Sequence, residues 1–222
     1  SSNFFYLTGI NNPSMLLIIT KTSTRHSTTL VCDRPNDIDK IWHGQLPSKS
    51  SYKNQFEIQN VLYFDELKSL ELNDAKNIYF EFADENRFNE FISNLNLSQP
   101  QSRYLRNNTS RSTKIDLSNL IFDMRRIKSK SEVSLIRHAA KISAKAHINI
   151  MKKCKSGLKE YEVEADFIKH CMSERCEQAY PAIVASGKNA CVLHYTKNNS
   201  TLRSNSLLLV DAAAEYDNYA SD

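Results

Sequence analysis

The feature that most constrains the fold is a polar stretch near the middle of the chain. Residues 98–114 are mostly Ser, Gln, Asn, Arg and Thr, with hardly any apolar side chains. Such a stretch cannot bury enough apolar surface to form a core of its own. It therefore divides the 222-residue chain into two folded parts. We expect an amino-terminal domain at 1–100, a linker at 101–115 and a second domain at 116–222.

Composition and charge exclude several classes of protein. A chain with 41% hydrophobic and 24% charged residues is typical of one or two globular domains. Its 29 basic residues are interleaved with 25 acidic ones, so no long basic tract is available to bind nucleic acid. The longest apolar runs, at 15–19 and 207–210, are far shorter than the roughly 20 residues of a membrane-spanning helix. We expect neither nucleic-acid binding nor a membrane span.

The first hundred residues alternate short apolar runs with helix-like segments, a pattern typical of a small α/β domain. The apolar runs predict strands at residues 4–7, 15–19, 28–31, 61–64 and 78–82. One helix is predicted at 38–42. A second is predicted from four apolar residues that share a helical face, Phe88, Phe91, Ile92 and Leu95.

Two amphipathic helices are predicted after the linker. Ser129 and Glu132 form a capping box that starts the first helix, and Gly157 is a typical stop signal. The second helix is predicted at 159–175. The apolar residues at helical spacing are Val133, Ile136, Ala140, Ala144 and Met151 in the first helix, and Tyr161, Ala165, Ile168 and Met172 in the second. His147 and His170 lie on these helices and are predicted to be structural.

Beyond residue 180 the pattern becomes that of a second sheet. Strands are predicted at 183–185, 191–195, 207–213 and from 219 onward. Asp217 and Asn218 form a good tight-turn pair because both residue types tolerate positive φ. Residues 207–222 are therefore predicted to form a hairpin.

Two aspartates in this hairpin are candidate metal ligands. Asp211 follows four apolar residues, so a carboxylate enters what reads as a buried strand, where an unpaired charge costs several kcal/mol. Asp222 lies on the returning strand, and a divalent cation between the two carboxylates is one form of compensation. A turn cap or a lysine partner for Asp211, with Asp222 on the surface, is the simpler reading of spacing alone. His194 likewise reads first as a hydrogen-bonded residue of a half-apolar strand.

Several sequence blocks resemble aminopeptidase P in their order and spacing. The resemblance is carried in the second domain by Tyr-Pro-Ala-Ile-Val-Ala-Ser-Gly at 180–187, Asn-Ala-Cys-Val-Leu-His-Tyr-Thr at 189–196, Val-Asp to Glu-Tyr at 210–216 and Tyr-Ala-Ser-Asp at 219–222. It extends upstream through Ile-Lys-Ser at 127–129, Glu132, Ala-Ala at 139–140 and Tyr-Glu-Val-Glu at 161–164. In the first domain it includes Phe-Tyr-Leu-Thr-Gly at 5–9 and Ile-Trp-His-Gly at 41–44.

The resemblance implies a fold, a reaction and a set of site residues. The fold is a creatinase/aminopeptidase P-like α/β domain followed by the first part of an α+β pita-bread catalytic domain. In that family two metal ions, commonly Mn²⁺, activate a bridging water that removes one amino-terminal residue. Asp211 and Asp222 would be metal ligands, and His194 would be catalytic and hold the substrate or its transition state. Trp42 would line a substrate site, with a place in the core as the alternative.

The resemblance also implies that the chain is incomplete for catalysis. Family members need one histidine and two glutamate ligands carboxy-terminal to residue 222, so these 222 residues are expected to be truncated inside the catalytic domain and inactive alone. Two residues depart from the family pattern. Ala213 replaces a glycine near the metals, where its methyl group could narrow the site, and Asn218 replaces a turn glycine without cost.

Substrate, partners and location follow from the same resemblance. The expected substrates are the amino termini of peptides or of imported mitochondrial proteins, since the chain looks closest to the intermediate cleaving peptidase branch; the cytoplasm is the alternative location. A homodimer is required if Trp42 reaches a neighbouring subunit's site. The competing hypothesis is a metal-free pita-bread homologue that binds peptides or proteins. Retention of Asp211 and Asp222 favours the enzyme.

Overall fold

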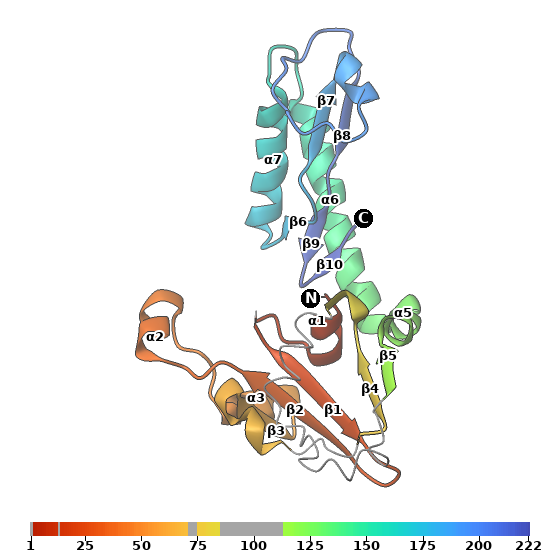
Figure 1. Ribbon diagram of the computed structural model, residues 1–222. Helices are drawn as coiled ribbons and strands as arrows, with labels where there is room; N and C mark the ends of the chain where they lie inside the picture. The colour runs from red at the N-terminus through yellow and green to blue at the C-terminus, as the bar shows by residue number, and fades with distance from the viewer. Residues whose placement is uncertain (1, 13, 71–74, 85–112) are drawn as a thin grey trace, which may run out of the picture. The chain divides into compact units, whose positions relative to one another are not determined.

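The computed structural model describes residues 2–12, 14–70, 75–84 and 113–222, which belong to two compact units (Figure 1). The first unit ends at Arg126 and the second begins at Ile127. Each has its own cluster of buried apolar side chains. The helix predicted from Phe88, Phe91, Ile92 and Leu95 lies outside the described residues.

A three-stranded sheet organises the first unit, in the order β1–β2–β3. β1 (Leu16–Lys21) pairs antiparallel with β2 (His26–Cys32), and β2 pairs parallel with β3 (Asn60–Tyr63). Leu30 and Val31 of the central strand are fully buried, as expected for apolar residues with a neighbour on each side. These strands confirm the three predictions made from the apolar runs.

Short helices connect the strands. α2 (Asp37–His43) confirms the predicted helix, and the side chain of Asn36 caps it by accepting a hydrogen bond from the Asp39 amide at 2.7 Å. α3 (Lys49–Phe56) was not predicted, and its buried Tyr52 belongs to the apolar cluster of the sheet. The described residues of this unit also include the 3-10 helices η1 (Phe64–Ser69) and η2 (Phe82–Asp84).

The strand predicted at residues 4–7 is wrong, because this segment belongs to α1 (Ser2–Thr8). A short continuous apolar run has no period that separates a strand from a helix. The helix ends at Gly9, whose positive φ of 70° lets its amide donate to the Phe5 carbonyl at 2.7 Å. Glycine adopts this conformation without the cost that a side chain would add.

A second pair of strands fixes where the first unit ends. β4 (Asn77–Phe80) pairs in parallel with β5 (Thr113–Asp116), and α5 (Ser118–Arg126) follows directly. The predicted linker at 101–115 lies mostly outside the described residues, but 113–115 form part of β5. Because β5 is held to β4 by backbone hydrogen bonds, the division between units falls after Arg126 and not before residue 116.

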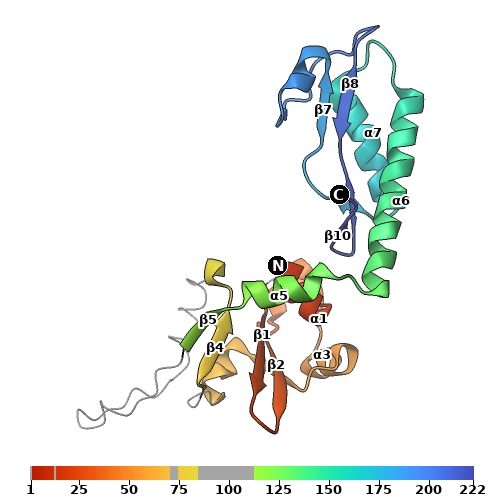
Figure 2. The ribbon, with the colours of Figure 1, turned by 90° about the vertical axis from the view of Figure 1, so that its right-hand side faces the viewer.

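Two long helices lie side by side along the strands of the second unit (Figures 1 and 2). α6 (Lys130–Lys153) starts at the predicted capping box, in which Ser129 Oγ accepts from the Glu132 amide and Glu132 accepts from the Ser129 amide. α7 (Glu160–Ser173) starts with one half of such a pairing, in which the Glu162 carboxylate accepts from the Lys159 amide at 2.6 Å. Both predicted helices are therefore confirmed.

The faces that these helices bury differ from the predicted ones. Met151, Tyr161 and Met172 are exposed by 69%, 53% and 69% respectively. The buried positions are Ala139, Ile142, Ser143, Ala146 and Ile150 in α6, and Glu160, Val163, Phe167 and Cys171 in α7. Each helix carries apolar residues at helical spacing on more than one face, so spacing alone does not identify the face that packs against the sheet.

Two small sheets complete the second unit. β7 (Ile183–Ser186) pairs antiparallel with β8 (Leu208–Asp211). β9 (Ala214–Tyr216) pairs antiparallel with both β6 (Glu177–Gln178) and β10 (Tyr219–Ala220).

The strand predicted at residues 191–195 is wrong. The 3-10 helix η4 (Gly187–Cys191) ends there, and residues 192–194 form an exposed bend and turn. Only Tyr195 of the segment is buried. The short, mostly apolar run at 191–195 thus belongs to a loop held by side-chain contacts and not to a strand. Among the described residues, no helix combines the length and the apolar character needed to cross a membrane.

Candidate metal centre

Asp211 is the last residue of β8 and faces solvent. Its strand partner is Ile183, and burial alternates along β8, with Leu209 and Asp211 on the more exposed face. The expectation that Asp211 enters a buried strand is therefore wrong. Four successive apolar residues suggested a fully buried strand, but β8 belongs to a two-stranded sheet and is only half covered. The carboxylate is open to a ligand from solvent.

The predicted hairpin brings Asp222 back towards Asp211. β9 and β10 pair through Tyr216 and Tyr219, and the chain reverses at Asp217 and Asn218, whose φ angles are 47° and 63°. Two consecutive positive φ angles are those of a type I′ turn, which matches the twist of paired strands. This confirms the turn predicted from the two residue types, including the tolerance of Asn218 for the left-handed region.

A tyrosine that sequence reasoning did not select joins the two carboxylates. The Tyr180 hydroxyl lies 2.6 Å from Asp211 Oδ1 and 3.0 Å from Asp222 Oδ2. The two carboxylate oxygens are thus no farther apart than the sum of these lengths. Burial and the two carboxylates together raise the pKa of Tyr180 well above its usual range, so the hydroxyl stays protonated and remains a donor. The place of Tyr180 at the start of the 180–187 block was the available signal.

The charges at this site fit a cation. One hydroxyl hydrogen serves two carboxylates, and no basic side chain pairs with either aspartate among the described residues. Hard carboxylate oxygens of this kind suit Mg²⁺, Mn²⁺ or Ca²⁺. Within the described part of the chain, no group of three or more His, Cys, Asp or Glu side chains could hold a metal ion. Asp211 and Asp222 therefore supply two ligands, not a full coordination set.

Helix α6 holds the backbone between the two aspartates. His147 Nε2 lies 2.9 Å from the Ala212 carbonyl, and the Ala214 amide donates to Ser143 Oγ at 2.8 Å. Ser143 also bonds the Ser221 hydroxyl, next to Asp222, at 2.8 Å. His147 is thus structural, as predicted. Ala213 is 2% exposed, so its methyl group packs inside the unit.

Two further predicted site residues, His194 and Trp42, take no part in the hydrogen bonds of the aspartate pair. His194 lies in the exposed turn after η4 and, among the described residues, has no hydrogen bond to Asp211 or Asp222. Trp42 lies on α2 of the first unit and is 76% exposed, which excludes a place in the core. Their roles stay predictions that rest on the resemblance.

Comparisons with known proteins match both units. The model of the aminopeptidase P amino-terminal domain matches residues 1–79, and that of metallopeptidase family M24 matches residues 134–222. The Xaa-Pro aminopeptidase of Escherichia coli is 31% identical over 228 residues, which is all of this chain and 51% of that protein. The chain thus spans about half the length of this curated relative.

Solved structures agree with the sequence matches. Aminopeptidase P from E. coli superposes with a TM-score of 0.91 at 29% identity, covering 100% of this chain and 51% of that one. Two further E. coli structures, both with TM-scores of 0.90, carry alanine in place of single aspartates whose positions differ by eleven, as those of Asp211 and Asp222 do. These findings show that the chain belongs to the aminopeptidase P family, with the amino-terminal domain followed by part of the pita-bread domain.

Proposed function

We propose that the full-length protein is a metal-dependent aminopeptidase that removes one amino-terminal residue from peptides. The observation that carries this proposal is the pair of carboxylates, Asp211 at the end of β8 and Asp222 after β10, that share the Tyr180 hydroxyl. The relatives are Xaa-Pro aminopeptidases, and the aspartates replaced in two of their solved structures have the same separation as this pair. The reaction class and the residue pair thus support each other.

The pair would hold part of a site for two divalent ions, which we propose to be Mn²⁺. Such ions would supply a metal-activated water and would polarise the substrate carbonyl. Asp211 and Asp222 would bind the ions through their carboxylate oxygens. The Tyr180 hydroxyl holds the two carboxylates close together through its hydrogen bonds. We propose that His194 contacts the substrate, and that Trp42 does so from its exposed position on α2.

The finer proposals concern substrate and compartment. The amino termini of imported mitochondrial proteins are the proposed substrates, and the mitochondrion is the proposed location. Both rest on the pattern of the first domain. Fractionation of cells that express the tagged full-length protein would test the location, with the cytoplasm as the contrary result.

The decisive experiment measures release of amino-terminal residues by the full-length protein. Peptides with and without proline at the second position are assayed in Mn²⁺ and in chelator, together with Asp211→Asn and the matched control Asp166→Asn. Asp166 lies on α7 and forms an ion pair with Lys153 at 3.0 Å. It makes no hydrogen bond with Asp211, Asp222 or Tyr180 among the described residues. We expect activity that requires metal, that is lost in Asp211→Asn and that is retained in Asp166→Asn.

Other outcomes have a clear meaning. No release from a broad peptide panel, with Mn²⁺ bound, would contradict the enzyme and favour a peptide-binding module. Equal loss in both variants would show that the carboxylate of Asp211 has no special role.

A further inference from the structure

Glu160 is a charged side chain enclosed inside the second unit. It is the first residue of α7, it is 0% exposed, and it is the only Asp, Glu, Lys or Arg in the buried class among the described residues. Burying an ionised carboxylate is costly unless hydrogen bonds replace its water shell. The hydrogen-bond partners of Glu160 therefore show which parts of the structure this buried carboxylate holds together.

Five donors surround the carboxylate. Oε1 accepts from the Ser186 amide and hydroxyl, both at 2.7 Å, and from Asn189 Nδ2 at 3.1 Å. Oε2 accepts from the Tyr195 hydroxyl and the Ser200 amide, both at 2.8 Å. Burial opposes the charge, but these hydrogen bonds outweigh it and lower the pKa of Glu160 to about 2. The carboxylate is ionised and fully satisfied.

The capping of α7 does not need this carboxylate. Glu162 accepts from the Lys159 amide at 2.6 Å and so provides the side-chain hydrogen bond at the start of the helix. The Glu160 amide donates to the Ser200 carbonyl at 3.0 Å. Every side-chain bond of Glu160 goes to the end of β7, to η4 or to the segment that follows.

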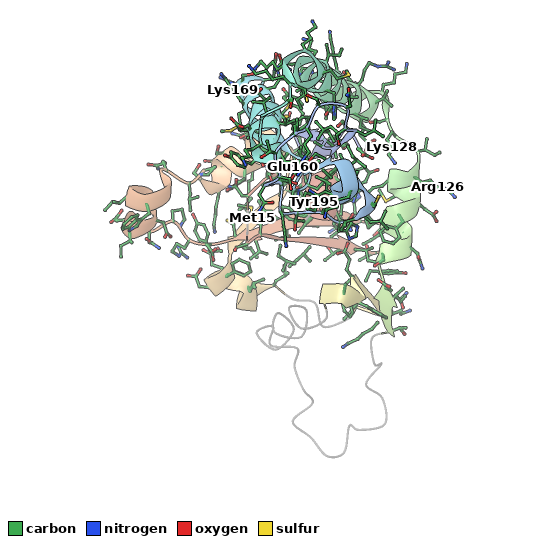
Figure 3. The ribbon with its side chains drawn as sticks, turned by 90° about the horizontal axis from the view of Figure 1, so that it is seen from above. Met15, Arg126, Lys128, Glu160, Lys169 and Tyr195 are labelled. Carbon is green, nitrogen blue, oxygen red and sulfur yellow. The ribbon has the colours of Figure 1, made fainter. Side chains whose placement is uncertain are left out.

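That segment is the one that carries His194. Residues 192–200 contain no helix or strand, and their backbone is not held by a sheet. Glu160 contacts the residues before, within and at the end of the segment, and Tyr195, which it holds, is the neighbour of His194 (Figure 3). Asn189 Nδ2 lies 3.1 Å from the Tyr195 hydroxyl as well, so the tyrosine is held from two sides.

A second buried residue anchors the far side of the segment. Asn198, at a positive φ of 42°, accepts from the Val184 amide at 3.0 Å and donates to the Ala182 carbonyl at 2.9 Å. It thus ties the segment to β7, the partner strand of β8 and Asp211. The His194 segment and the strand that carries Asp211 are therefore held by one continuous set of hydrogen bonds.

We infer that Glu160 is a positioning residue for His194: acting through Tyr195, it holds the His194 segment in the one conformation from which the histidine meets the substrate. This inference rests on the proposed function, in which His194 contacts the substrate. Glutamine at position 160 has one acceptor oxygen and a donor NH₂ group, so an amide donor would face the Ser200 amide or the Ser186 donors. The segment would loosen while the aspartates stay in place.

The test compares Glu160→Gln with Glu162→Gln in the full-length protein. Both changes lie in the first turn of α7, but only the first contacts the segment. We expect kcat/KM to fall at least about tenfold in Glu160→Gln, as for loss of a hydrogen bond to a charged group, and to stay within about twofold in Glu162→Gln. Mn²⁺ affinity by calorimetry is expected to be unchanged in both.

A double mutant separates positioning from a general loss of stability. In the His194→Ala background, Glu160→Gln is expected to have almost no further effect on kcat/KM, because the group it positions is gone. Full additivity of the two changes, or reduced Mn²⁺ affinity in Glu160→Gln, would overturn the inference. If Glu160→Gln does not fold, Tyr195→Phe removes a single hydroxyl of the same path and is expected to act in the same direction.

A last measurement keeps this inference distinct from the proposed function. The His194 ring signals, identified by their absence in His194→Ala, are followed by NMR in all variants. We expect them to shift and broaden in Glu160→Gln and in Tyr195→Phe but not in Glu162→Gln, even in a protein without peptidase activity. Unchanged signals in Glu160→Gln would contradict the inference whatever the activity.

Discussion

At the scale of single residues, the carboxylate pair is organised by one hydroxyl. Without a bound cation, the negative charges of Asp211 and Asp222 repel each other. The Tyr180 hydroxyl donates a hydrogen bond to both carboxylates and so offsets this repulsion. A cation would take over most of this stabilisation. The hydroxyl therefore matters most to the metal-free protein.

This leads to a prediction for Tyr180→Phe. In chelator we expect the free energy of unfolding to fall by about 1.5 kcal/mol, because the hydroxyl shared by two charged acceptors is lost. In saturating Mn²⁺ we expect the difference to narrow, so that the metal stabilises the variant more than the parent. Thermal unfolding of the full-length protein with and without Mn²⁺ measures this. Tyr161→Phe, at an exposed position on α7, is the control.

A second prediction concerns acid stability. The pKa of Glu160 is lowered from 4.5 to about 2 in the folded protein, so its contribution to stability is complete above pH 4.5 and is lost as the pH falls towards 2. We expect the urea midpoint of the second unit to fall across this range, and to fall less steeply in Glu160→Gln. If the urea midpoints of the two proteins fall equally with pH, Glu160 is not the source of the acid sensitivity.

Sequence reasoning reached Asp211 and Asp222 through resemblance, not through spacing. Tyr180 was not selected because its place at the start of the 180–187 block does not show that its hydroxyl, and not its ring, makes the decisive contact. Glu160 escaped because helix starts commonly carry acidic residues on the surface. Its burial depends on residues as distant in sequence as Ser200, which no local pattern reveals.

At the scale of elements, the turn at Asp217 and Asn218 lies between the two aspartates and reverses the chain that leads to Asp222. We predict that Asn218→Ala lowers the free energy of unfolding by about 1 kcal/mol, because alanine tolerates positive φ less well than asparagine. It should also weaken Mn²⁺ binding by the full-length protein. Asn218→Gly, which has no such cost, is the matched control. Equal affinities and stabilities in the two variants would show that the turn does not set the site.

Helices and hairpins whose ends are marked by a capping box or a turn pair could be predicted from the sequence. Short apolar segments without such markers could not. The capping box at Ser129 and Glu132 located α6, and the turn pair located the β9–β10 hairpin. The segments at 4–7 and 191–195 were misassigned because each is too short to show a period. Their conformations are set by Gly9 in the first case and by hydrogen bonds to Glu160 in the second.

At the scale of the whole molecule, the two units have separate buried clusters. We predict that Phe167→Ala, in the core of the second unit, lowers the free energy of unfolding of that unit by about 3–5 kcal/mol. Hydrogen exchange should then quicken in α6 and α7 and stay unchanged in β1–β3. Met172→Ala, at an exposed site on the same helix, is the control. Faster exchange throughout both units would show that they unfold together.

The exposure of Trp42 has a practical consequence for work in solution. It is the chain's only tryptophan, and it lies on a short helix with 76% of its surface open to water. Its fluorescence is therefore that of a hydrated indole, accessible to quenchers. Any molecule that covers α2 would shield the indole and shift its emission to shorter wavelengths. The chain thus carries an intrinsic optical probe for that one surface.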